Sequence, residues 1–466
     1  MKRRPKNSNY WLALTVLSVS GCAISPERGT LPELAHPDEW TAASGAQTGA
    51  PEAWLSDFNS PELEALVDEA LRYNPNLQIT AARFQQALAE AAITRADQLP
   101  VVGLNLDGNR QQISTFGPTT SDGTIFENYN LGFDINWEID LWGRLSDQTD
   151  ASLAELEATE AELRGARLSL TAQVTKAWFN YLTATELVKL AEKTVQTYEN
   201  NTKTMEARFK RGLSDGLNLR RIRSQASSAL ADLTIREREL DQASRILEQV
   251  LGRYPSAELT TQTPLPEPPA MIPPGLPSEL LTRRPDLVAA ERRLFAAELE
   301  LSASQKLRLP QLSLTASGGT SSQEFNNLLD DNFSVWLLGA NLTQPIYQGG
   351  RIQAGIKRSE ALLAQAEASY REAAIQAFYE VESALSAEGF LRAEEAALKL
   401  ASAEADRSEA LAWGRFRNGT TEFIDALDTE RTAAAARVQH ISTRNQLLQN
   451  RIDLYLALGG PFDQES

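Results

Sequence analysis

The sequence is poor in the residues from which disulfides, metal sites and reactive centres are commonly built. Its 466 residues include one cysteine, two histidines and three methionines. A single cysteine excludes an intrachain disulfide and a cysteine-built zinc site, and His36 and His440 lie far apart in the sequence. No P-loop, strand–turn–helix GxGxxG pattern or GxSxG elbow occurs. We therefore expect no catalytic residue, no metal and no cofactor, and we do not interpret the protein as an enzyme.

Basic residues are also in deficit, and the N-terminal apolar run is short. Lysine and arginine number 45 against 62 acidic residues, a formal net charge of −17. Because proteins neutralise nucleic-acid phosphates with basic side chains, nucleic acid is not an expected partner.

The apolar run Tyr10–Val19 is half the roughly 20 residues that a membrane-spanning helix needs, and basic residues precede it. This layout is typical of a secretory signal peptide.

The end of that segment, Val19-Ser20-Gly21-Cys22, resembles the bacterial lipobox. The resemblance implies removal of residues 1–21 and attachment of a diacylglycerol to the thiol of Cys22. The alternative is ordinary cleavage with Cys22 incidental, although the only cysteine lies where the motif requires one. Ala23 follows, rather than the aspartate that retains lipoproteins at the inner membrane. The resemblance thus implies a lipid-anchored protein of the cell outer membrane.

Internal repetition organises the rest of the chain. Five motifs recur at offsets of 210 (285 − 75) or 207 (350 − 143) residues. They pair Asn74-Pro75-Asn76-Leu77 with Arg284-Pro285-Asp286-Leu287, Leu99-Pro100 with Leu309-Pro310, Gly143-Arg144 with Gly350-Arg351, Arg208–Gly212 with Arg415–Gly419, and Leu251-Gly252 with Leu458-Gly459. We expect a tether at 22–57, a first copy at 58–252, a proline-rich linker at 253–277, a second copy at 278–459 and a tail at 460–466.

Each copy contains a segment that predicts a very long helix. From Arg144 to Arg211 there is no proline, and apolar residues recur at spacings of three and four, as in a coiled coil. The predicted seam comprises Leu153, Leu156, Glu160, Leu163, Arg167, Leu170, Val174, Ala177 and Tyr181. The second copy repeats the pattern from Gln353 to Asn418, with alanine at Ala366, Ala373, Ala377 and Ala384. Such helices, on the order of 100 Å long, indicate an elongated helical assembly.

Two segments in each copy predict β-strands. Apolar and polar residues alternate without a break over 128–141, which gives one apolar and one polar face. We expect strands at about 101–113 and 127–142 in the first copy and at about 311–320 and 333–346 in the second. The last is the weakest, since Val335–Leu338 run together. Soluble hairpins are one interpretation; strands of roughly 10 residues with one polar face also match outer-membrane barrels, which the lipobox favours.

Four strands per chain then require association, because the smallest membrane barrels have about eight strands. Lipid tolerates no open sheet edge, so several chains would share one barrel. Two chains would give about eight strands and a filled interior, whereas three would give about twelve and leave a lumen. A conducting pore therefore favours at least three subunits.

These features resemble the TolC-like outer membrane factor family, and more narrowly its NodT and OprM type. The resemblance rests on the lipobox at Cys22, the paired repeats, the junctions at Pro100 and Pro310, and the Arg-Phe-x-x-Gly turns ending at Gly212 and Gly419. It implies a mainly α protein with a membrane β-barrel portion. It further implies a homotrimer with a 12-stranded β-barrel on a periplasmic α-barrel, docked on a periplasmic adaptor and an inner-membrane pump, of RND type.

The expected function is that of the outer-membrane exit duct of a tripartite efflux pump for small molecules. One alternative is the outer-membrane component of a type I protein secretion system, a branch that commonly lacks a lipobox. Another, of a different class, is a structural coiled-coil lipoprotein of the envelope, against which the alternating strands speak.

Two turns are predicted to contact the adaptor. Gly212-Leu213-Ser214 and Gly419-Thr420-Thr421 join the long helices to their return helices. Glycine suits the left-handed turn after a helix, and Ser214 or Thr421 is expected to cap the helix that follows. The alternative is that both are only good turns. In the related family these turns meet the tip of the adaptor.

A gate is predicted just after the second turn. Asp425 and Asp428 are three residues apart and share one helix face. In a trimer they would form two stacked rings of carboxylates that repel each other and bind cations, and the family's constriction has aspartates at the same offsets from the turn glycine. The alternative is an ordinary solvated face. Copy one has Asn218 in place of Asp425, and Thr421 takes a position that is often basic in relatives.

Overall fold

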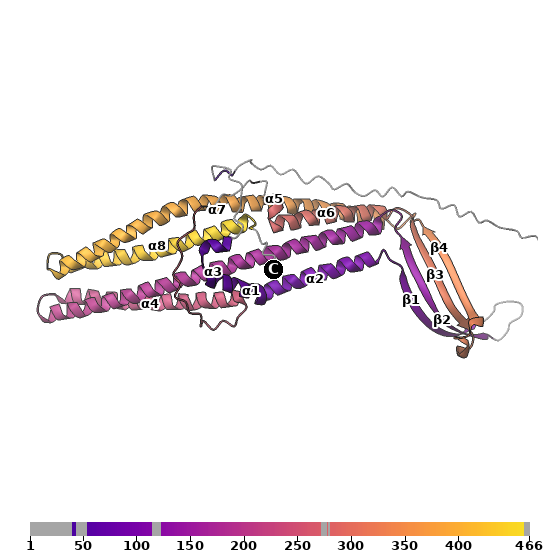
Figure 1. Cartoon of the computed structure of the whole chain (residues 1–466), viewed down its shortest axis with the longest axis horizontal. Coiled ribbons are helices and arrows are strands. Elements are labelled where there is room, and N and C mark those ends of the chain that lie inside the picture. Colours follow the sequence, from indigo (N-terminus) through magenta and orange to yellow (C-terminus); the bar gives the residue numbers. More distant parts are fainter. Residues whose placement is uncertain (1–39, 43–53, 114–122, 272–276, 278–279, 461–466) are drawn as a thin grey trace, which may run out of the picture. The chain divides into compact units, whose positions relative to one another are not determined.

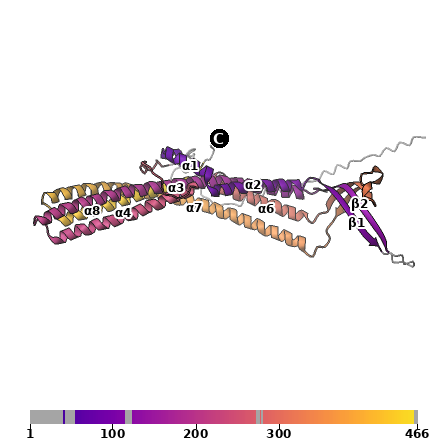
Figure 2. The same ribbon diagram turned by 90° about the horizontal axis from the view of Figure 1, so that it is seen from below.

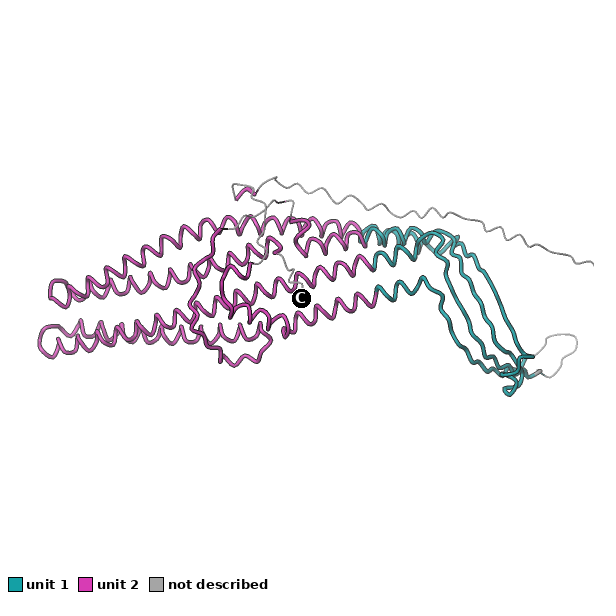
Figure 3. Tube along the Cα trace, in the orientation of Figure 1, with its two compact units in different colours: residues 1–29, 91–152, 297–362 teal, residues 30–90, 153–296, 363–466 magenta. Residues whose placement is uncertain are grey.

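The computed structural model describes residues 40–42, 54–113, 123–271, 277 and 280–460, and the chain divides into two compact units. One unit contains the described residues between 91 and 152 and between 297 and 362, and the other contains the remaining described residues (Figure 3). The boundaries between the units fall inside long helices. None of the described helices combines the length and the apolar character that a membrane crossing requires.

Both copies fold into the same order of elements, two helices, two strands and two long helices (Figure 1). In the first copy these are α1 (Pro61–Tyr73), α2 (Pro75–Ala96), β1 (Val101–Ile113), β2 (Thr124–Ile139), α3 (Arg144–Lys210) and α4 (Gly216–Leu251). In the second copy they are α5 (Leu280–Arg283), α6 (Pro285–Lys306), β3 (Gln311–Ser322), β4 (Ser334–Thr343), α7 (Arg351–Arg417) and α8 (Phe423–Ala457). This order confirms the expected fold class of two repeats, each with two strands and long helices.

The repeated proline motif fastens the start of α2 and of α6 to the end of a return helix. The Asn74 side chain accepts hydrogen bonds from two N–H groups in the first turn of α2 and donates to the Val250 carbonyl at the end of α4 (2.7 Å). Arg284 donates to the Ala457 carbonyl at the end of α8 (3.0 Å). Val250 and Ala457 are equivalent positions, 207 residues apart. Different side chains thus make the same link in the two copies, and proline suits the first helical turn that follows.

The four strands form one antiparallel sheet in the order β1-β2-β3-β4. Their register places apolar residues opposite one another on a single face, as in the pairs Leu104–Phe133, Ile135–Ala316 and Leu312–Leu342. The alternation that predicted two faces in β2 therefore extends over all four strands. Many large side chains of this face, including Leu104, Phe133 and Trp336, are exposed in the isolated chain.

The irregular fourth strand obeys the same rule. Trp336 and Leu338 of β4 lie opposite Gly318 and Ala316, on the apolar face, while Val335 and Leu337 lie on the other face. The alternation is interrupted at Val335–Leu338 because Val335 and Leu337 are apolar residues on the mostly polar face. β1 and β4 are the outer strands, and neither has a second strand partner within the described chain.

The predicted seam of α3 is only partly the buried one. In its first half the buried row is alanine (Ala151, Ala154, Ala158 and Ala161), whereas Leu153 of the predicted seam is 42% exposed. Ala158 and Ala161 pack against Ala289 of α6, because small side chains allow the two helices to approach closely. From Leu170 onward the predicted residues, including Val174 and Tyr181, are buried. The prediction was wrong for the segment that pairs with α6.

The largest core surrounds the middle of α3. Trp178, Phe179 and Leu182 pack there with Leu63 of α1 and Tyr455 of α8. The Tyr455 ring stacks on Trp54, with ring centroids 5.3 Å apart. This core joins elements from the start, the middle and the end of the chain.

The proline-rich linker runs without helix or strand over 254–271 and is fastened by side chains. The buried Glu248 carboxylate accepts hydrogen bonds from the backbone N–H of Ala257 (2.7 Å) and of Glu258 (3.2 Å). Further along, the N–H of Leu265 donates to Glu186 (2.9 Å), and Arg444 donates to the Leu265 carbonyl (3.0 Å).

Candidate functional site at the hairpin ends

The two predicted turns share one backbone geometry. Gly212 and Gly419 have φ of 72° and 75°, the left-handed region that glycine enters without strain. The N–H of the residue after each glycine donates to the carbonyl five residues earlier, Leu213 to Arg208 at 2.9 Å and Thr420 to Arg415 at 3.0 Å. The hairpins α3/α4 and α7/α8 run side by side, and their turns lie at the same end of their unit (Figures 1 and 2). The structure therefore brings the predicted adaptor-contact residues to one end.

The caps of the return helices differ from the prediction. Asp215, not Ser214, is the N-cap of α4, and its carboxylate accepts from the N–H of Asn218 (2.8 Å). Glu422 is the N-cap of α8 and makes no capping hydrogen bond with its side chain. Thr421 instead donates its hydroxyl to Asp425 (3.3 Å). Because Asp215 lies one residue closer to the helix than Ser214, its carboxylate reaches the free N–H groups of the first turn.

Asp425 and Asp428 lie together on an exposed face of α8. The opposite side of the same turn buries Phe423, Ala426 and Leu427. The spacing of three residues thus places both carboxylates on the solvent side of the hairpin in the isolated chain. What that face meets in an assembly decides whether it forms a gate.

Behind the turns, an apolar cluster ties the two hairpins together. We call it the tip cluster; its buried members are Tyr198, Met205, Leu219, Ile222, Ala229, Phe416, Phe423, Ala426 and Leu427. The rings of Phe416 and Phe423 lie 5.6 Å apart, and the Arg208 guanidinium lies 4.7 Å from the centroid of Phe416. Since Arg208 belongs to α3 and both rings belong to the second copy, this cation–π contact crosses between the hairpins.

An open groove of about 420 Å³ lies between the two turns, with both charged and apolar walls. Arg208 and Arg221 contribute basic groups, and Asp215 and Glu422 contribute acidic ones. At its rim, Leu213 is 64% exposed and Leu217 is 57% exposed. An exposed leucine beside a charged groove can contact a partner helix with an apolar residue flanked by charges.

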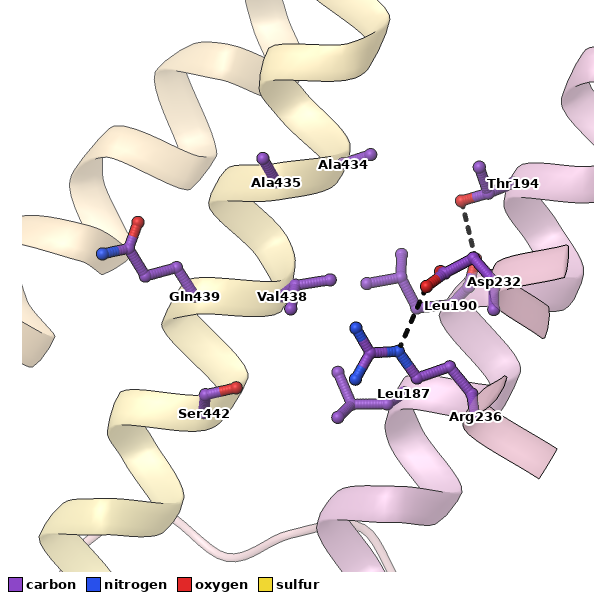
Figure 4. Close-up of a pocket in the computed structure, with 11 residues that line it drawn as sticks. Leu187, Leu190, Thr194, Asp232, Arg236, Ala434, Ala435, Val438, Gln439 and Ser442 are labelled. Carbon is purple, nitrogen blue, oxygen red and sulfur yellow. Dashed lines mark hydrogen bonds and ion pairs between the residues drawn. The ribbon is translucent and has the colours of Figure 1, made fainter. Parts of the chain in front are cut away.

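A second open groove, of about 500 Å³, lies further along the same hairpins, between α8 and the pair α3 and α4 (Figure 4). Ala434 and Val438 of α8 face Leu187 and Leu190 of α3 across it. The short alanine side chain leaves α8 loosely packed against α3 here, in contrast to the aromatic contacts of the tip cluster.

Sequence reasoning missed one buried acid next to the predicted gate. Glu430 of α8 is 3% exposed and accepts a hydrogen bond from Asn201 of α3 (3.2 Å). Burial and the nearby charge of Glu409 raise the pKa of Glu430 to about 7. The sequence offered a weak signal only: Glu430 follows Ala426 by four residues and precedes Ala433 by three, on the apolar side of α8. The predicted lipidation site Cys22 lies outside the described residues.

The comparisons with known proteins agree with this architecture. The model of the outer membrane efflux protein family matches residues 66–253 and 276–460. The outer membrane protein OprJ of Pseudomonas aeruginosa is 32% identical over 97% of this chain and 95% of its own length. The cation efflux system protein CusC of Escherichia coli is 28% identical over 96% of this chain and 97% of its own.

A solved structure agrees with the same assignment. The open state of the Neisseria gonorrhoeae MtrE outer membrane channel has a TM-score of 0.84 at 28% identity, covering 96% of this chain and all of that one. The chain belongs to the outer membrane efflux protein family. It is therefore an efflux channel of the outer membrane, as the resemblance implied.

Proposed function

We propose that this chain is the exit duct of a tripartite pump, through which small molecules leave the cell. An inner-membrane pump of RND type would deliver them through a periplasmic adaptor. The observation that carries the proposal is the sheet, which has one continuous apolar face and, within the described residues, two edges without a partner strand. The same chain holds two long helical hairpins with their turns at one end.

The proposed assembly is a homotrimer. The outer edges of β1 and β4 carry backbone groups that need partners in lipid. Pairing β4 of one chain with β1 of the next would satisfy both edges. Three chains of four strands would close a barrel of twelve, wide enough for a lumen. The apolar face, with Phe133 and Trp336 exposed in the isolated chain, would then meet lipid.

In such a trimer the hairpin ends have two proposed roles. Asp425 and Asp428, exposed on α8, would form two rings of three carboxylates that narrow the periplasmic mouth. The turn residues Gly212–Ser214 and Gly419–Thr421 would receive the adaptor. What supports the second role is the exposed Leu213 beside a groove with both signs of charge.

Two measurements on cells and purified protein test the function. The full-length protein in planar bilayers is expected to conduct ions, and cells that lack it should accumulate small amphipathic dyes while their protein secretion is unchanged. Absence of conductance would instead favour a structural envelope lipoprotein. Loss of protein secretion with normal dye export would indicate a type I secretion channel.

The lipid anchor is tested separately. We expect the mature chain to begin at Cys22 and to carry a diacylglycerol, because Val19-Ser20-Gly21-Cys22 has the lipobox pattern. Mass spectrometry of the mature N-terminus measures both properties, and Cys22→Ser supplies the unlipidated control. An unmodified N-terminus that starts elsewhere would contradict the anchor and leave the duct proposal intact.

A further inference from the structure

Glu430 is a buried carboxylate that forms no ion pair with any described residue. Its Oε2 atom accepts one hydrogen bond, from the neutral Asn201 amide (3.2 Å). Within the described part of the chain, its Oε1 atom and the indole N–H of Trp413 on α7 are both buried without a hydrogen bond, although the nearby indole favours the anion in part. Buried carboxylates are ordinarily paired or fully hydrogen-bonded, because desolvation of the charge is costly. Glu430 therefore lies in a place that suits the neutral acid better than the anion.

The charged groups around it compensate only in part, because Arg437 favours the anion but burial and Glu409 outweigh it. The titratable groups that face this region are Tyr198 of α3, Glu409 of α7, and Arg431 and Arg437 of α8, and α4 contributes the neutral Gln225. Arg437 is held by Asp406 (2.8 Å) and by Glu409 (2.6 Å), while Arg431 is exposed. Glu409 of α7 repels the Glu430 anion, whereas Trp413 of the same helix favours the anion; burial and Glu409 together leave the pKa raised.

The position of Glu430 connects it to the proposed gate. It follows Asp428 by two residues on α8, and its bond to Asn201 joins the second hairpin to the first. On the side toward the turns lies the aromatic tip cluster. On the other side lies the groove between Ala434 or Val438 and the leucines of α3 (Figure 4). The acid thus lies where tight packing of α8 changes to loose packing, and a shift of α8 has room there.

We propose that Glu430 is a proton-dependent latch on the channel: the neutral acid holds α8 against α3 with the gate closed, and loss of its proton releases α8 toward the open state. This inference rests on the proposed function of Asp425 and Asp428 as a gate. The periplasm exchanges protons with the medium through outer-membrane pores, so the latch would make the duct respond to external pH.

The direction of the pH dependence follows from the state in which Glu430 binds its proton more tightly. Burial and Glu409 raise the pKa of Glu430 in the packed state to about 7, above the value of about 4.3 for a solvated glutamate. The protonated acid therefore stabilises the packed state fully at a pH below the pKa of a solvated glutamate. This stabilisation is lost as the pH rises toward 7, and it changes little at higher pH. Acidic medium favours the closed channel, and alkaline medium favours opening.

The test uses the full-length channel in planar bilayers with the periplasmic side titrated from about pH 5 to about pH 8.5. The wild-type open probability should rise at least tenfold across this range. Glu430→Gln, which resembles the neutral acid in shape, should keep the low open probability at every pH while each open channel conducts normally. His440→Gln, which removes the only imidazole among the described residues, should leave the rise in place.

Two outcomes of the bilayer recordings overturn the latch. One is a Glu430→Gln channel with the wild-type pH profile; the other is a rise that His440→Gln abolishes. A channel that does not conduct at any pH would contradict the proposed function instead. In that case the pH dependence of thermal unfolding tests the latch. Wild-type Tm should fall between about pH 5 and about pH 8 and Glu430→Gln should not follow that fall, whereas equal slopes for both proteins refute the latch.

Discussion

The two hairpin ends have the same backbone and opposite chemistry. Gly212 and Gly419 adopt nearly the same φ, and each turn closes with the same pair of backbone hydrogen bonds. Yet the positions that follow, related by 207 residues, differ in charge. Asn218, Arg221 and Arg223 in the first copy correspond to Asp425, Asp428 and Glu430 in the second. Duplication has kept the turn that glycine makes possible, while the surface next to it has acquired a basic character in one copy and an acidic one in the other.

The two copies also differ in how deeply the equivalent residues Arg223 and Glu430 are buried. Arg223 is exposed and pairs with Glu206 (2.7 Å), whose pKa it lowers. Its counterpart Glu430 is buried, with a raised pKa. Equivalent positions in the two copies thus favour charge in one environment and neutrality in the other. The second copy is the one with features suited to a gate.

The largest expected effect concerns the acidic face. Asp425→Ala combined with Asp428→Ala would remove six carboxylates from the proposed trimer. It should weaken block by multivalent cations from the periplasmic side, so that the blocking concentration rises roughly tenfold or more. Because rings of carboxylates attract cations, we expect the wild-type channel to be cation-selective and this variant to lose that selectivity. Bilayer recordings measure both properties.

The matched control is the equivalent pair in the first copy. Asn218→Ala with Arg221→Ala should leave the cation block unchanged. If the aspartate variant keeps wild-type selectivity and block, or if both variants lose them equally, the two copies do not differ in the way proposed and the aspartates are not the gate.

A second test addresses the turns themselves. Leu213 is 64% exposed, and Thr420 occupies its position in the other turn. Leu213→Asp should abolish cross-linking to the adaptor without affecting trimers, because a charge replaces the apolar contact. Thr420→Asp should have a smaller effect, since a polar side chain already stands there. Site-specific cross-linking in cells measures both variants; wild-type cross-linking by Leu213→Asp would refute the contact.

The smallest expected effect is on stability, and it differs between the N-caps of α4 and α8. Asp215 and Glu422 are equivalent N-caps, but only Asp215 makes a side-chain capping bond. Asp215→Ala should therefore lower the free energy of unfolding by about 1 kcal/mol, and Glu422→Ala should leave it nearly unchanged. Chemical denaturation of both variants measures the difference, and equal losses would show that the caps contribute alike.

The features predicted best from the sequence depend on local geometry. The glycine turns follow from the need for positive φ, and the two faces of the sheet follow from the two-residue period of a strand. Even the irregular β4 keeps that period, because Trp336 and Leu338 pair with residues on the apolar face of β3. The order of elements could be predicted since each copy repeats the other.

The features that the sequence could not supply depend on which element packs where. Leucine spacing suggested one buried row in α3, but α6 packs on the alanine row at Ala158 and Ala161. A glutamate is ordinarily expected at the surface, and Glu430 is buried only because α3 and α7 pack around it. The gate itself needs neighbouring chains, so its sequence motif remains a prediction.

The fastened linker determines where this chain can be divided. A gene split between the two copies would place its break among residues 254–271, which have no helix or strand. A nick at Ala257 would leave the buried Glu248 carboxylate without backbone donors that it now holds at 2.7 and 3.2 Å. A nick at Leu265, 3% exposed, would open the largest core. Fused or split versions of this protein should therefore keep the linker whole and attached to the first copy.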